Sequence, residues 1–194
     1  MFEDTMRLTI ITGSVRDGRF GPTVTDWFAR VAAQRPEFEL DVIDLAQLDI
    51  PADMSVNDDQ RELAARIEAA DAIVVVTPEY NHSYPGPLKT AIDSLKTQWQ
   101  AKPVGFISYG GLSGGLRSVE ALRIVFAELH AVTVRDVVAF PMAWTKFDEN
   151  GDPVETEIVG IAADALLDSL TWWAAALKKA RAEAPYGQPM AIAR

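Results

Sequence analysis

A polar loop with three prolines has the residue types best suited to holding a flat polar ligand. It runs from Thr77 to Lys89 and reads Thr-Pro-Glu-Tyr-Asn-His-Ser-Tyr-Pro-Gly-Pro-Leu-Lys. Proline fixes φ, and we expect Gly86 to let the backbone turn into a following helix. A loop stiffened in this way presents backbone N–H and C=O groups to a ligand at a small entropic cost. The sequence therefore predicts a binding loop, with an ordinary strand-to-helix turn as the alternative.

A second loop, 13–23, has the composition of a phosphate site. It carries three glycines, two arginines and two hydroxyl side chains, and a segment of helical period follows it. Backbone N–H groups and a helix dipole attract an anion there, and an arginine can bind it through two hydrogen bonds. The spacing is neither Gly-x-Gly-x-x-Gly nor that of a nucleotide P-loop, so a monophosphate is the simpler ligand. A solvated basic loop is the alternative.

A third loop, 109–117, reads Tyr-Gly-Gly-Leu-Ser-Gly-Gly-Leu-Arg. Its glycine pairs allow the backbone to approach a ligand closely. The segment 111–115 also matches the Gly-x-Ser-x-Gly pattern of serine hydrolases. No histidine follows His130, which leaves Ser113 without an obvious base, so a hydrolase is only a minor alternative.

Alternating strands and helices must position these loops. The apolar run 72–76 is typical of a strand buried on both faces of a parallel sheet. Further strands are expected at 7–12, 38–45, 104–108 and 132–140, and helices at 24–31, 58–70, 90–99, after Arg117 and at 156–183. In a sheet ordered 2-1-3-4-5, the ends of strands one, three and four lie side by side at the switch point. The three loops are therefore predicted to converge there.

Composition limits the function classes. The chain has 194 residues and suits one domain over 1–194, with a core at 7–183 and a loose tail at 184–194. A net charge of −10 disfavours nucleic acid or an anionic membrane as partner. The absence of cysteine excludes thiol redox chemistry, so a redox reaction would need a cofactor. With no signal segment and no apolar run near the length of a membrane span, we expect a cytoplasmic protein.

The three loops together resemble the NAD(P)H-dependent FMN reductase family. The matching motifs are Gly-Ser-x-Arg after strand one, Thr-Pro-Glu-Tyr-Asn-x-Ser-x-Pro-Gly after strand three, and Gly-Gly-x-x-Gly-Gly after strand four. The resemblance covers about residues 7–180. It implies a flavodoxin-like three-layer α/β sandwich, FMN as cofactor, and NADPH or NADH as electron donor. It also implies a small-molecule acceptor, namely a quinone, azo compound, metal oxyanion or free flavin, and a homodimer or homotetramer.

The resemblance assigns roles to matched positions, all of them in cofactor binding. By this resemblance, the FMN phosphate is bound by Ser14, Arg16, Phe20, Gly21, Pro22 and Thr23. The ring system is lined by Pro78, Glu79, Tyr80, Asn81 and Ser83, with Ser108, Gly110 and Gly111 at the opposite edge. No catalytic side chain and no metal site is implied. The chain departs from the family at Arg19 and Gly21, where many members carry serine and asparagine.

Some roles remain open at this point. His82 is expected in a loop or interface. Glu79 is expected to form a salt bridge between subunits, and Arg117 to lie at a subunit contact or to bind a nicotinamide phosphate. A flavodoxin-type electron carrier without NAD(P)H turnover is the main alternative function. The paired arginines of the phosphate loop argue against it.

Overall fold

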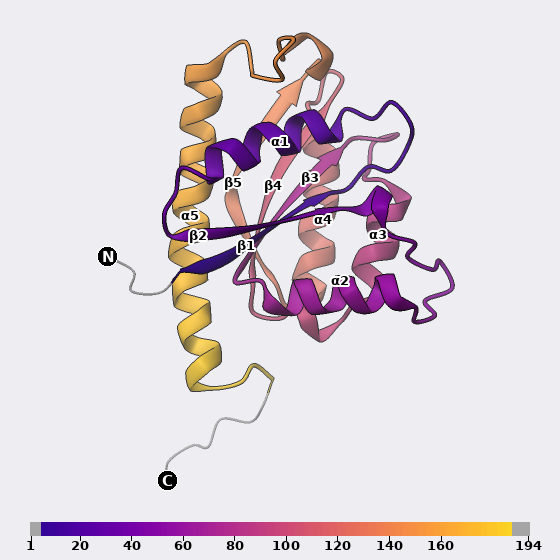
Figure 1. The fold of residues 1–194 in the computed structure, drawn as a ribbon, viewed down its shortest axis with the longest axis vertical. Helices are drawn as coiled ribbons and strands as arrows, with labels where there is room; N and C mark the ends of the chain where they lie inside the picture. Colours follow the sequence, from indigo (N-terminus) through magenta and orange to yellow (C-terminus); the bar gives the residue numbers. More distant parts are fainter. Residues whose placement is uncertain (1–4, 188–194) are drawn as a thin grey trace.

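The computed structural model describes residues 5–187 and has a five-stranded parallel sheet at its centre (Figure 1). The strand order is β2-β1-β3-β4-β5, as predicted. The strands are β1 (Met6–Thr12), β2 (Phe38–Asp44), β3 (Ala72–Pro78), β4 (Pro103–Gly110) and β5 (Val132–Pro141). This is the flavodoxin-like order, and it confirms the predicted fold class.

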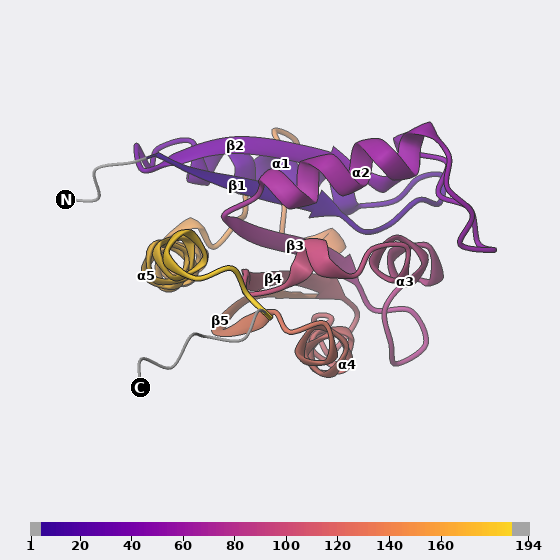
Figure 2. The same ribbon diagram turned by 90° about the horizontal axis from the view of Figure 1, so that it is seen from below.

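Helices cover both faces of the sheet and complete the three layers. Figure 2 shows α5 on one side of the strands and α3 and α4 on the other. The α-helices are α1 (Gly21–Ala32), α2 (Asp58–Ala69), α3 (Gly86–Asp93), α4 (Leu116–Glu128) and α5 (Thr156–Glu183). Short 3-10 turns are η1 (Leu45–Gln47), η2 (Thr97–Trp99) and η3 (Ala143–Thr145).

The central strand β3 explains why the sheet is buried on both faces. All seven of its residues are buried. Because successive side chains alternate, Val74 and Val76 pack in the core under α1 and α5, whereas Ile73 and Val75 pack with α2, α3 and α4. A central position in a parallel sheet is therefore the environment that this unbroken apolar run requires.

Helix α5 is long and apolar enough, by length and composition alone, to cross a membrane. This differs from the expectation that no apolar segment approaches that length. The described structure accounts for part of the composition, since Leu166, Leu167 and Leu170 are fully buried against the sheet. Of the most apolar stretch of the helix, 33% is buried, and this part belongs to the core.

The structure shifts several predicted boundaries. β1 begins at the buried Met6, one residue before the strand predicted at 7–12. The helix expected over 90–99 ends at Asp93, and Trp99 lies in the separate turn η2. Of the predicted loose tail, residues 188–194 lie outside the described part of the chain. Within the described part, the Tyr186 hydroxyl lies 2.9 Å from Nδ1 of His130.

Candidate cofactor site

One cavity of about 390 Å³ lies where the three predicted loops converge. It is at the carboxyl ends of the strands, beside the switch point between β1 and β3. The cavity is lined by Arg16, Gly18, Phe20, Pro78, Glu79, Tyr80, Tyr109, Gly110, Gly111, Ala143 and Trp144. Seven of these residues belong to the predicted set, and the convergence of the loops is confirmed.

At the phosphate-loop end, the cavity has a positive charge on Arg16 and lies near the uncapped N-terminus of helix α1. The guanidinium carbon of Arg16 lies 5.5 Å from the centroid of the Tyr80 ring, within reach of a cation–π contact. Helix α1 begins at Gly21 with no side-chain cap and no acidic residue in its first turn. Pro22 has no N–H, so the N–H groups of Gly21 and Thr23 are the ones that this uncapped start leaves for an anion. Arg19 does not line the cavity and forms an ion pair with Asp44 at the end of β2.

A buried pair of hydroxyl groups, on Ser14 and Tyr109, packs against the phosphate loop 13–23. Ser14 is fully buried, and its Oγ lies 3.0 Å from the hydroxyl of Tyr109. Gly21 packs directly over the pair: a Cβ at this position would lie 2.5 Å from Ser14 Oγ and 3.0 Å from the Tyr109 hydroxyl. Burial raises the pKa of Tyr109 above its ordinary value, so the phenol keeps its proton. Ser14 therefore lies behind the cavity in this structure and does not line it.

The aromatic loop is built on a two-residue hairpin. The Tyr80 N–H donates to the Ser83 carbonyl at 2.8 Å, and the Ser83 N–H donates to the Tyr80 carbonyl at 3.1 Å. Asn81 and His82 occupy the turn with φ of 49° and 74°, the left-handed values that a tight hairpin needs. Helix α3 begins at Gly86, as expected, but the φ of Gly86 is not left-handed. The hairpin directs Tyr80 to the cavity, while Asn81 and Ser83 form the turn and its closing bridge.

A charged cluster joins the aromatic loop to the glycine loop. The Ser113 hydroxyl and the Arg117 guanidinium both donate to the Glu79 carboxylate, the latter at 2.8 Å. Burial raises the pKa of Glu79, but these hydrogen bonds outweigh it and hold the pKa below its usual value. The pairing lies within one chain, and a bridge between subunits for Glu79 stays a prediction. The pairing also leaves Ser113 bonded to a carboxylate rather than a histidine, an arrangement that does not activate a serine hydroxyl as a hydrolase requires.

The remaining predicted residues lie around the cavity rather than in its wall. Ser108 is buried, and its hydroxyl donates to the Gly114 carbonyl at 2.8 Å, which holds the glycine loop in place. Pro22 and Thr23 lie in the first turn of α1, and Thr23 lines a separate polar cavity with Asp26 and Arg30.

Four lining residues were not predicted: Gly18, Tyr109, Ala143 and Trp144. Tyr109 immediately precedes the glycine pair, so its place in the sequence offered a signal. Ala143 and Trp144 belong to η3 after β5, where a lone tryptophan in a long loop gave no chemical pattern. Trp144 is 62% exposed at the edge of the cavity.

A slightly larger cavity, about 420 Å³, lies between η1, the loop after it and the start of α3. Among the residues that the structure describes, this cavity is lined by apolar side chains such as Val15, Leu45, Leu48 and Ile50, and by no arginine or lysine. Volume alone would favour this cavity. The chemistry of a phosphate-bearing ligand favours the smaller one, because of these two cavities only the smaller is lined by an arginine, Arg16.

The fold and this cavity define a flavodoxin-like α/β protein with its ligand site at the switch point of the sheet. The chain belongs to the NADPH-dependent FMN reductase family, whose model matches residues 6–145. It is 34% identical over 124 residues to an NAD(P)H-dependent FMN reductase of Schizosaccharomyces pombe, covering 57% of this chain and 61% of that protein. It is 32% identical over 138 residues to a quinone reductase of Escherichia coli, covering 66% of this chain and 73% of that one.

A solved structure with the same fold is the flavoenzyme NAD(P)H:(acceptor) oxidoreductase FerB from Paracoccus denitrificans. The TM-score is 0.67 at 22% identity, and the match covers 87% of this chain and 98% of that one. At this identity the likeness shows the fold alone.

Proposed function

We propose that this chain is an NAD(P)H-dependent oxidoreductase that binds FMN in the cavity of about 390 Å³. The observation that carries the proposal is that Arg16, Phe20 at the uncapped start of α1, and an aromatic, glycine-lined wall share one cavity. Such a combination suits a ligand with a phosphate at one end and a flat ring at the other. Family membership supports the same ligand.

The residues present fit FMN at both ends. At the phosphate end, Arg16 and the first N–H groups of α1 supply charge-assisted donors. At the ring end, a Cβ built at Gly111 would meet nothing within 4 Å, so the backbone is open to a flat ligand. The cavity volume lies within the range of roughly 300–1,000 Å³ typical of small-molecule sites.

FMN, when bound, accepts a hydride from a reduced nicotinamide and passes electrons on to an acceptor, becoming more negative when reduced. The residues of this chain hold, orient and shield it. Glu79 stays ionised and Tyr109 stays protonated, so neither is poised to exchange a proton at neutral pH. We therefore assign no catalytic side chain.

We further propose a small planar conjugated acceptor, with a quinone as the first candidate. Trp144 offers an exposed aromatic surface at the cavity edge. One relative is named a quinone reductase and another, from Bacillus, an NADPH azoreductase. An azo compound, a metal oxyanion and free flavin are the other acceptors to compare.

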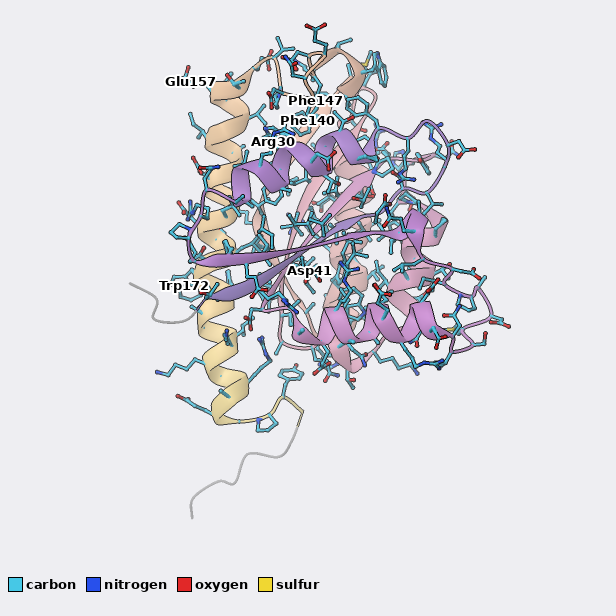
Figure 3. All side chains as sticks on the ribbon, in the orientation of Figure 1. Arg30, Asp41, Phe140, Phe147, Glu157 and Trp172 are labelled. Carbon is cyan, nitrogen blue, oxygen red and sulfur yellow. The ribbon has the colours of Figure 1, made fainter. Side chains whose placement is uncertain are left out.

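We also propose a cytoplasmic homodimer or homotetramer. Exposed apolar side chains on α5 support self-association: Ile158, Ile161, Trp172 and Trp173. Trp172 lies on the outer side of α5 (Figure 3). Light scattering of the purified protein, with Trp172→Glu as the variant, tests this assembly. A monomeric wild type would refute it.

The test of the function titrates the purified protein with FMN and with riboflavin, and then adds NADPH or NADH without oxygen while the flavin visible band is recorded. Bleaching of the band is expected. Arg16→Met should weaken FMN binding at least tenfold, because a charge-assisted hydrogen bond contributes about 1.5–3 kcal/mol, and should leave riboflavin binding unchanged.

The matched control is Arg30→Met, which removes an arginine of α1 that pairs with Asp152 outside the cavity. It should bind both flavins normally. Absence of flavin binding in the wild type would refute the proposal. Binding without bleaching by either nicotinamide would indicate an electron carrier instead.

A further inference from the structure

We propose that Glu79 and Arg117 are positioning residues that set the charge at the ring end of the cavity and thereby the redox potential of bound flavin. The inference rests on the proposed function, since it concerns FMN in this site. Neither residue is assigned a chemical step.

The contacts place one member of a neutral ion pair, Glu79, in the cavity wall, while Arg117 lies outside the lining with its side chain 51% exposed. Glu79 lines the cavity and its side chain is only 9% exposed. One carboxylate oxygen accepts a hydrogen bond from Arg117 and the other from Ser113. Both oxygens are therefore satisfied within the chain, and the negative charge beside the cavity is balanced by Arg117 alone.

The position of Arg117 indicates that it serves Glu79 rather than its own helix. It is the second residue of α4, where a cation opposes the helix dipole. The first turn of α4 has no acidic residue and no side-chain cap. Glu79, 38 positions earlier and on another loop, supplies the missing negative charge. The pair thus also fixes the aromatic loop against the glycine loop.

A fixed charge acts on a ligand whose own charge changes. The more negative, reduced state of FMN is disfavoured by an uncompensated carboxylate and favoured by an uncompensated guanidinium. Burial of Glu79 strengthens the effect of the carboxylate, because the effective dielectric constant is lower than in water, whereas solvent screens the half-exposed Arg117 and makes its effect smaller. Removing Arg117 and neutralising Glu79 should therefore shift the midpoint potential in opposite directions.

The experiment measures the midpoint potential of bound FMN by dye equilibration in the wild type, Arg117→Met, Glu79→Gln and the double variant. We expect a lower potential for Arg117→Met, a higher one for Glu79→Gln, and a near-normal one for the double variant. A tenfold change in the ratio of affinities for reduced and oxidised FMN corresponds to about 30 mV for a two-electron couple. Arg117→Lys keeps the charge and should keep the wild-type potential.

Arg61→Met is the control, since Arg61 pairs with Asp58 on the exposed side of α2, away from the cavity. Shifts of the same sign in both single variants, or no shift in either, would show that the pair has only a structural role. If Glu79→Gln does not fold, the comparison of Arg117→Met with Arg117→Lys decides alone. A wild type that binds no FMN refutes the proposed function instead, and that result is known before any variant is compared.

Discussion

Two glycines in matched positions allow the packing at the phosphate loop to be tested directly. Gly21 and Gly86 are each the first residue of a helix, and each precedes a proline. Alanine before proline restricts the backbone in the same way at both sites. The two variants therefore differ mainly in what the added Cβ meets. At Gly86 it meets nothing within 4 Å, whereas at Gly21 it lies 2.5 Å from Ser14 Oγ and 2.9 Å from Thr12 Cγ2.

The contacts at Gly21 set the expected magnitude. Ser14 and Thr12 are buried, and the Tyr109 hydroxyl would lie 3.0 Å from the added Cβ, so the Cβ overlaps three packed side chains at once. Overpacking of this kind costs about 1–3 kcal/mol. For a chain of this size that corresponds to a melting temperature roughly 2–12 °C lower for Gly21→Ala than for Gly86→Ala. FMN binding should weaken as well, because the displaced atoms support the start of α1.

The assay is thermal unfolding of both variants beside the wild type, followed by FMN titration. A larger loss for Gly21→Ala, in stability and in FMN affinity, is expected. Equal losses in the two variants would show that the pre-proline backbone, and not the contact with Ser14, limits position 21. Such a result would refute the tight packing inferred here.

Three further predictions concern stability. Burial lowers the pKa of Lys102 to about 8, so between pH 8 and 10 the unfolded chain holds a proton that the folded chain has released. The free energy of unfolding should therefore rise by roughly 2 kcal/mol over this pH range. Urea titrations should show that Lys102→Met flattens the rise. His82→Gly should raise stability by about 1 kcal/mol in the same assay, since His82 holds a left-handed φ that glycine adopts freely; a loss would mean that its ring makes a contact worth more. Asp71→Asn should lower the free energy of unfolding by about 2 kcal/mol, because Lys178 and Arg181 both form ion pairs with this largely buried carboxylate. The control is Asp58→Asn on the exposed side of α2, and an equal loss of stability in the two variants would contradict the prediction.

The sheet could be predicted because its evidence is local. The unbroken apolar run of β3 permits only a strand buried on both faces, and strands alternate with helices along the chain. Given the order 2-1-3-4-5, the convergence of three loops follows from topology alone. The structure confirms the order, and the cavity lies where these loops meet.

Side-chain pairing could not be predicted, because it joins residues that no short pattern connects. The Glu79–Arg117 pair spans 38 positions and two loops. Trp144 reaches the cavity only because β5 ends beside β4, which brings η3 to its edge. The two-residue hairpin could not be predicted from the sequence either, because the turn has His82 at the position where an Asn-Gly hairpin would have glycine.

The neighbours of Gly21 and Arg19 explain the two positions at which the resemblance led us to expect other residues. At position 21, any side chain would collide with Ser14 and Tyr109, so glycine is required once Tyr109 packs against the loop. At position 19, the arginine ties the loop to Asp44 at the end of β2. Arg16 is then the one arginine of this loop that lines the cavity. The phosphate end of this chain should therefore depend on Arg16 and backbone N–H groups more than on hydroxyl donors, which is why Arg16→Met is the substitution expected to separate FMN from riboflavin.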